Sequence, residues 1–97
     1  MVHKKTIQRI ANIVIPLLKK QGIARAGIFG SYARGEETKS SDVDLLVKIK
    51  GAKSLLDVVH LQLELQKNLK KRVDLLEYNE IHPYLKKKIL SEEVRIL

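Results

Sequence analysis

Aspartates and a glycine-serine pair are the residues of this sequence whose types and spacing could support chemistry. Asp42 and Asp44 stand one residue apart near the end of the segment GSYARGEETKSSDVDLLV, which begins with Gly30 and Ser31. Two aspartates at that spacing on a strand share one face. There, each raises the pKa of the other unless a cation or a strong hydrogen-bond donor compensates. The pair therefore predicts a site built to receive a cation.

A parallel pair of strands is expected to bring a third aspartate to the same place. Hydrophobic residues alternate through DVDLLVKIK, the pattern of a half-buried strand that begins at Asp42. An amphipathic helix over residues 54–70, with Ser54 as its cap, separates this strand from a second one, RVDLLEY. A strand-helix-strand unit makes its two strands parallel, with a right-handed crossover. Because parallel strands begin at the same edge of a sheet, we expect Asp74 to join Asp42 and Asp44.

The other elements follow from local patterns. Residues 4–20 carry hydrophobic residues at helical spacing and end before Gly22, and residues 23–29 predict a short strand. Residues 80–91 predict a helix with His82 and Pro83 in its first turn, and EEVRIL at the end predicts either an edge strand or a segment that packs against the core. The expected fold class is α/β (α+β), a small mixed sheet flanked by helices. A chain of 97 residues has room for one domain, residues 1–97.

Three converging carboxylates predict a chemistry as well as a place. Carboxylate oxygens suit magnesium or manganese better than zinc, and two such ions about 4 Å apart support in-line displacement at phosphorus. We expect Asp42 and Asp44 to bridge the ions. Asp74 would hold the ion on the attacking side and accept the proton of an incoming hydroxyl. The Gly30-Ser31 turn, between a strand and a short helical turn, predicts a phosphate-binding site.

Composition narrows the partners. Nineteen basic and eleven acidic residues give a net charge of +8, which indicates an anionic partner. The absence of cysteine excludes disulfides and thiolate metal sites. No segment resembles a leader or a membrane span, so we expect a cytoplasmic protein. A P-loop is excluded, because Glu36 stands where its lysine would be, and the sequence has no dinucleotide fingerprint.

The segment GSYARGEETKSSDVDLLV, followed by VDLLEY, resembles the minimal nucleotidyltransferase (MNT) family of the DNA polymerase β superfamily. That family's signature is a Gly-Ser turn, a D-x-D strand and a third aspartate. The resemblance implies the polymerase β palm-like nucleotidyltransferase fold. It makes Asp42, Asp44 and Asp74 the catalytic residues and metal ligands. It also implies that the nucleotide is bound by a second set of residues, Gly30, Ser31, Arg34 and Ser41.

The resemblance also implies an activity and a partner. Members of this family are commonly antitoxins paired with a HEPN-domain toxin, an RNase. The implied reaction is the transfer of AMP from ATP, with two Mg²⁺ ions, to a hydroxyl of the toxin, expected to be a tyrosine, as in type VII-like antitoxins. The oligomeric state, homo- or hetero-oligomeric, is left open.

Two other function classes stay open at this stage. A non-catalytic antitoxin would neutralise the HEPN RNase by direct binding and would tolerate the loss of Asp44. A nucleic-acid-binding repressor fits the positive charge and would bind DNA with a steep dependence on salt. No helix-turn-helix pattern or aromatic-basic platform supports the repressor, so nucleic acid is not expected as the main partner.

Overall fold

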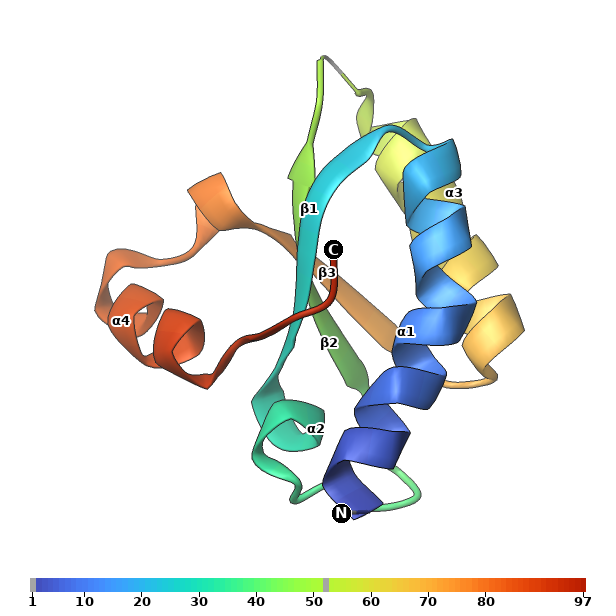
Figure 1. The fold of residues 1–97 in the computed structure, drawn as a ribbon. Coiled ribbons are helices and arrows are strands. Elements are labelled where there is room, and N and C mark those ends of the chain that lie inside the picture. Colours follow the sequence, from blue (N-terminus) through green and yellow to red (C-terminus); the bar gives the residue numbers. More distant parts are fainter. Residues whose placement is uncertain (1, 52) are drawn as a thin grey trace.

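The protein folds as a small sheet with helices on both sides (Figure 1). The computed structural model describes residues 2–51 and 53–97. The elements in chain order are α1 (Val2–Lys20), β1 (Ile23–Phe29), α2 (Gly30–Arg34), β2 (Val43–Ile49), α3 (Leu55–Leu69), β3 (Val73–Glu77), the 3-10 helix η1 (Tyr78–Glu80), α4 (Pro83–Glu92) and β4 (Val94–Arg95).

The sheet is mixed, which confirms the predicted fold class. Its strands lie in the order β3-β2-β1-β4. β2 and β3 are parallel and joined by α3, as the strand-helix-strand pattern predicted, whereas β1 runs antiparallel to β2 and to β4. The short β4 confirms the expected edge strand at the end of the sequence.

Local signals set most of the helix boundaries. Ser54 caps α3 through a reciprocal pair of hydrogen bonds with Asp57, and Gly22 follows α1 with a φ of 75°. One boundary prediction was wrong, because the last long helix does not start at Glu80. That residue ends η1, and α4 begins at Pro83 after His82, whose Nδ1 accepts a hydrogen bond from the Tyr84 N–H at 3.2 Å.

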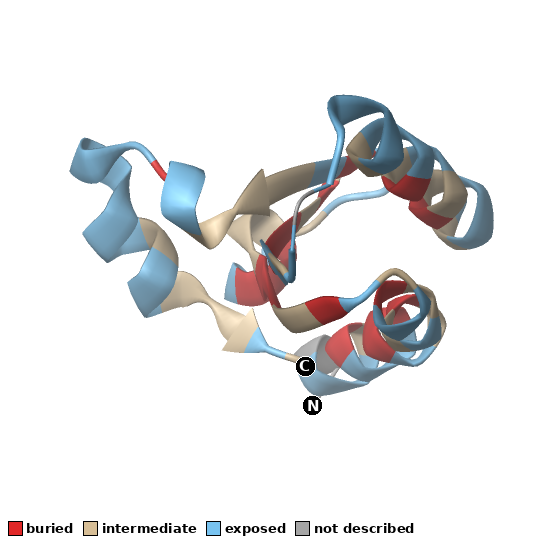
Figure 2. Ribbon diagram, turned by 90° about the horizontal axis from the view of Figure 1, so that it is seen from above, coloured by how far each residue is buried: buried red, intermediate tan, exposed pale blue. Residues whose placement is uncertain are grey.

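One face of the sheet carries the core. α1 and α3 cover this face, and α4 lies on the other side, where it buries none of its residues (Figure 2). The innermost side chains on this face come from β1, β2, β3 and the two covering helices: Val14, Leu18, Ile28, Val43, Leu45, Val47, Leu65 and Val73. Because β2 alternates, its other face carries Asp44, Leu46 and Lys48.

The apolar positions of α3 are not all core. Leu61 and Leu65 are buried, whereas Leu55, Leu56 and Leu63 are more than half exposed. The hydrophobic pattern of this segment predicts one amphipathic helix and does not separate its buried residues from its exposed ones. The packing of α3 on α1 and β3 selects the buried pair.

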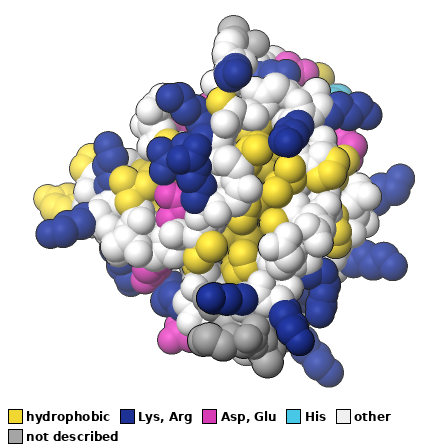
Figure 3. All heavy atoms as spheres, in the orientation of Figure 1, with side chains coloured by type: hydrophobic (Ala, Val, Ile, Leu, Met, Phe, Trp, Pro, Cys, Tyr) yellow, Lys and Arg dark blue, Asp and Glu magenta, His cyan; other side chains and the backbone are white. Residues whose placement is uncertain are grey.

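Charge is spread over the surface. Lysine and arginine side chains surround the face shown in Figure 3, and hydrophobic side chains gather between α1 and the C-terminal segment. Among the helices that the structure describes, none combines the length and the apolar character needed to cross a membrane.

Candidate active site

The register of the sheet brings two of the predicted aspartates side by side. Asp44 pairs with Asp74 across the parallel strands, and with Phe29 across the antiparallel ones. Gly30 directly follows Phe29, so the Gly-Ser turn lies at the same end of the sheet. The row Phe29, Asp44 and Asp74 thus joins the predicted phosphate turn to two predicted metal ligands.

The third aspartate lies just outside the strand, which corrects one detail of the prediction. β2 begins at Val43, whose N–H donates to the Arg72 carbonyl at 2.8 Å, so Asp42 is the last residue before the ladder. Its charge still reaches Asp44, because it contributes to the raised pKa of that carboxyl. All three aspartates therefore lie at the same end of the sheet, as the parallel strands predicted.

The carboxyl of Asp44 has a raised pKa. Burial is the main cause that raises the pKa of Asp44 to about 6, followed by the charge of Asp74, a hydrogen-bonding contact with the same carboxyl, and the charge of Asp42. Each cause disfavours the charged form when no cation is present. Asp44 is consequently a carboxylate whose surroundings favour a bound proton or cation.

Gly30 has a second role that sequence reasoning missed. Its φ is 73°, and a Cβ built at this position would collide with the Oδ2 atom of Asp44. A side chain here would therefore meet both an unfavourable backbone conformation and the carboxylate. Gly30 lets the turn pass close to Asp44, whereas its role in leaving room for a phosphate stays a prediction.

Ser31 lies in the first turn of α2, next to Gly30. No side chain caps the N-terminus of α2. Within the described part of the chain, the Ser31 hydroxyl makes no hydrogen bond, while its carbonyl accepts one from the Glu36 N–H at 2.9 Å. A hydroxyl without a hydrogen-bond partner, at a turn that leads from a strand into a helix, is a group that can bind a phosphate oxygen.

Arg34 and Ser41, the other two predicted nucleotide-binding residues, are engaged within the protein. The Arg34 guanidinium donates to Glu36 at 2.7 Å and to Glu92 at 3.1 Å. The Ser41 hydroxyl accepts a hydrogen bond from the Thr38 N–H at 2.8 Å and so organises the loop before β2. Their nucleotide-binding role stays a prediction, and Arg34 would have to exchange carboxylates for phosphate.

Two glutamines of α3 hold the start of β3. The Gln62 side chain donates to the Val73 carbonyl at 2.6 Å, and the Val73 N–H donates to Gln66 Oε1 at 3.1 Å. The residue after Val73 is Asp74, so these bonds position its strand. The two glutamines are four residues apart on a helix, so their spacing predicts that they are neighbours. Nothing in the sequence indicates that Val73 is their partner.

A glutamate that the sequence analysis did not single out lies over the same sheet face. Glu93, whose side chain is 6% exposed, accepts a hydrogen bond from the Tyr78 hydroxyl and pairs with Arg25 at 3.4 Å. Gly27 makes room for it, since a Cβ there would collide with the Glu93 carboxylate. Burial, followed by the hydrogen bond to Glu93, raises the pKa of Tyr78 to about 12. These contacts attach the end of α4 to β1.

The carboxylates suit a magnesium site by their chemistry. Within residues 2–51 and 53–97, no three acidic or histidine side chains are close enough to hold a metal ion as they stand. Carboxylates that share a site repel one another when no cation is present, so some separation is expected. The all-oxygen donor set and the raised pKa of Asp44 both fit a hard divalent cation.

Comparison with known proteins agrees with this arrangement. Residues 12–97 match the family model described as polymerase beta, nucleotidyltransferase. A Methanocaldococcus jannaschii protein, named provisionally as protein adenylyltransferase MJ0435, is 53% identical over 91 residues, which are 94% of this chain and 98% of that one. Protein adenylyltransferase MntA of Thermococcus cleftensis is 35% identical over 95 residues, with 94% and 96% covered.

Solved structures show the same fold. A provisionally assigned minimal nucleotidyltransferase is 36% identical, with a TM-score of 0.79 over 93% of this chain and 92% of that one. A Shewanella oneidensis MNT antitoxin in complex with a tri-AMPylated HEPN toxin matches with a TM-score of 0.73 at 21% identity, over 93% and 71% of the two chains, which shows the fold alone. The chain therefore belongs to the polymerase β nucleotidyltransferase family, as one of its minimal nucleotidyltransferases.

Proposed function

We propose that this nucleotidyltransferase transfers AMP from ATP to a tyrosine hydroxyl of a partner HEPN-domain toxin, and so acts as a type VII-like antitoxin. The observation that carries the proposal is the row of Asp44 and Asp74 beside the Gly30-Ser31 turn. This row supports both parts of the reaction, a cation-dependent carboxylate pair and a place for phosphate. The names of the relatives, protein adenylyltransferases, support AMP as the transferred group.

Each residue of the site has a part in the proposed reaction. Asp42, Asp44 and Asp74 would hold magnesium, which when bound neutralises phosphate charge and promotes loss of the proton from the attacking hydroxyl. Gly30 and Ser31 would bind the phosphates of ATP, aided by a second set, Arg34 and Ser41. The hydroxyl oxygen attacks the α-phosphorus, the bond to the bridging oxygen of the β-phosphate breaks, and diphosphate leaves.

The acceptor hydroxyl loses its proton in this reaction, so a base must accept that proton. Asp74 is exposed at the start of β3, next to Asp44 in the sheet, and so can meet a hydroxyl that approaches over the sheet face. We assign it the role of base, in addition to metal ligand. Because the proposed reaction consumes ATP and acts on a toxin, we also propose that the protein works in the cytoplasm.

A non-catalytic antitoxin remains the alternative, and one observation favours keeping it. α3 exposes Leu55, Leu56 and Leu63, which could contact a partner without any chemistry. Neutralisation by contact would survive the loss of Asp44.

Label transfer separates the two functions. The protein, magnesium and a co-encoded HEPN partner are incubated with ATP labelled at the α-phosphate or, in parallel, at the γ-phosphate. The proposal expects label on the partner from the α position only, and none with Asp44→Asn. Label from the γ position would contradict nucleotidyl transfer. A tight complex without label, together with neutralisation by Asp44→Asn, would establish the alternative.

A further inference from the structure

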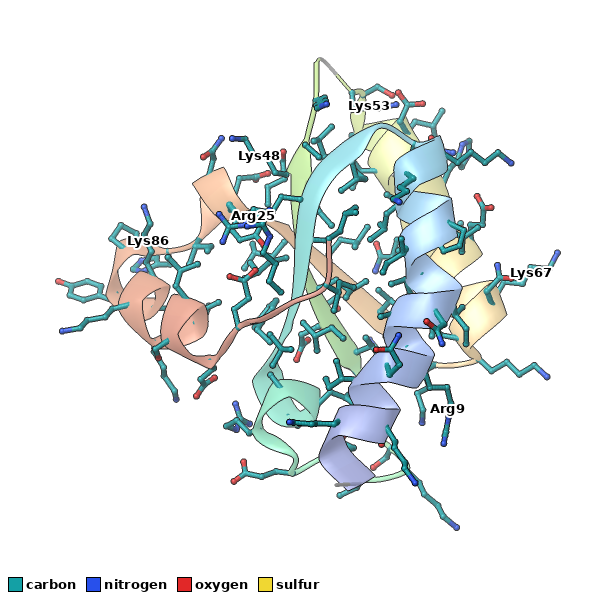
Figure 4. All side chains as sticks on the ribbon, viewed as in Figure 1. Arg9, Arg25, Lys48, Lys53, Lys67 and Lys86 are labelled. Carbon is teal, nitrogen blue, oxygen red and sulfur yellow. The ribbon has the colours of Figure 1, made fainter. Side chains whose placement is uncertain are left out.

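A basic pocket lies on the sheet face that carries Asp44, away from the predicted nucleotide turn. It has a volume of about 240 Å³ and lies between β1, β2, η1 and α4. In Figure 4, Arg25, Lys48 and Lys86 lie on the side of the sheet opposite α1 and α3. The pocket is lined by Arg25, Lys48, Tyr78, Asn79, Lys86 and Leu90.

The register of the sheet fixes where this pocket lies relative to the reaction. Arg25 pairs with Lys48, four residues along the same antiparallel ladder from the pair of Phe29 and Asp44. Four residues of strand span about 13 Å. Arg25 precedes Phe29 in β1, whereas Gly30 follows Phe29 directly, so the two residues lie on opposite sides of Phe29 along the chain. The nucleotide turn and the basic pocket therefore lie on opposite sides of the row that holds Asp44.

Arg25 is held in place before any ligand arrives. Its guanidinium lies 4.6 Å from the centre of the Tyr78 ring, and one terminal nitrogen is 3.4 Å from Glu93 Oε1. Its Nε is buried and makes no hydrogen bond within the described chain. The side chain as a whole is 40% exposed, so part of its guanidinium stays open to an anionic ligand in the pocket.

The two lysines are free to bind. Lys48 and Lys86 are exposed, and neither forms an ion pair with the residues that the structure describes. Among the residues that the structure describes, Glu93 is the one acidic side chain paired with a cation of the pocket, and it also accepts a hydrogen bond from Tyr78. The pocket thus retains net positive charge.

We propose that this pocket binds carboxylate side chains of the acceptor protein, and so orients the acceptor over the sheet; this inference rests on the proposed function. The triphosphate is expected at Gly30 and Ser31, so the opposite side of Asp44 is left for the acceptor. Lysine and arginine recognise carboxylates through charge-assisted hydrogen bonds. A nucleic acid would instead need a stripe of cations along its backbone, whereas these converge on one concave pocket.

The test measures binding separately from transfer. The double variant Lys48→Gln/Lys86→Gln is compared with Lys53→Gln/Lys67→Gln, which removes the same charge from exposed positions around α3 (Figure 4). Affinity for the HEPN partner is measured by calorimetry with all proteins in the Asp44→Asn background, where no transfer occurs. The KM for ATP and for the partner is then measured with Asp44 intact, and thermal melts establish that each variant is folded.

The expected result is specific to the pocket and to the acceptor. The Lys48/Lys86 variant should weaken partner binding at least tenfold and raise the KM for the partner, while the KM for ATP stays unchanged. The control should change partner affinity less than threefold. Equal losses in both variants would overturn the inference, because net charge would then be the cause.

Other outcomes also decide between the possibilities. A raised KM for ATP alone would assign the pocket to the nucleotide, and reduced affinity for a single-stranded RNA probe alone would assign it to nucleic acid; both overturn the inference. If the Lys48/Lys86 variant binds the partner more weakly but the protein with Asp44 intact transfers no AMP, the proposed reaction fails and the pocket assignment stands. If transfer occurs with unchanged partner affinity in the Lys48/Lys86 variant, the reaction stands and the pocket assignment fails.

Discussion

Replacing Asp44 by asparagine should stabilise the metal-free protein while it ends nucleotidyl transfer. Asp44 is partly buried and faces Asp74 in the sheet, with Asp42 nearby. Asparagine has nearly the same shape and no charge. The substitution therefore removes the repulsion and keeps the packing, but it also removes a proposed metal ligand. Stability and activity should change in opposite directions.

The size of the effect follows from the pKa of this carboxyl. Its pKa is about 6 in the folded protein, against an ordinary value of 3.8. That difference corresponds to at most about 3 kcal/mol. Because Asp44 is partly exposed, solvent screening reduces the expected effect to about 1–2 kcal/mol.

Because the pKa of Asp44 is raised in the folded state, the stability gained by Asp44→Asn should depend on pH. The folded state holds the Asp44 proton more strongly than the unfolded state, so protein stability falls as the pH rises from about 4 to about 6. Above that window the full cost is present. The Asp44→Asn variant lacks this cost at every pH, so its advantage should be absent near pH 4 and largest above pH 6.

Thermal unfolding by circular dichroism, in EDTA and between pH 4 and pH 8, measures the difference. At neutral pH the variant should melt higher by roughly 4–8 °C for each kcal/mol gained. Glu64→Gln, which removes a carboxylate from α3 on the other side of the sheet, is the control for net charge and should not melt higher. An Asp44→Asn variant that melts at or below the wild type at pH 7 would refute the crowded-carboxylate reasoning.

The remaining predictions concern the nucleotide side of the site. Gly30→Ala should lower the free energy of unfolding by about 1–2 kcal/mol in urea titrations, because of the positive φ, and should impair transfer by displacing Asp44; unchanged stability and activity would contradict the close approach. Ser31→Ala should weaken ATP binding, measured by calorimetry, by about 1.5–3 kcal/mol, and an unaltered affinity would remove the hydroxyl from the site. Glu92→Gln should lower the KM for ATP in the label-transfer assay, because it releases Arg34 for phosphate, whereas Arg34→Ala should raise it; if neither variant changes this KM, Arg34 has no contact with the nucleotide.

Local patterns in the sequence determined much of the fold. Alternation identified β2, and Ser54, the predicted cap, lies where α3 begins. The parallel pairing of Asp44 with Asp74 was also predictable, because a strand-helix-strand unit leaves few alternatives for its topology. These features depend on residues close in sequence or on a connection of fixed type.

Contacts between distant segments were decided only by the tertiary structure. Arg34 meets Glu92 and Arg25 meets Glu93 across 58 and 68 residues, because β4 pairs with β1 and brings the end of α4 to this sheet face. The antiparallel register that sets Gly30 against Asp44 is likewise invisible in either segment alone. Side-chain packing across the sheet selects such pairings, and no periodicity within one segment encodes them.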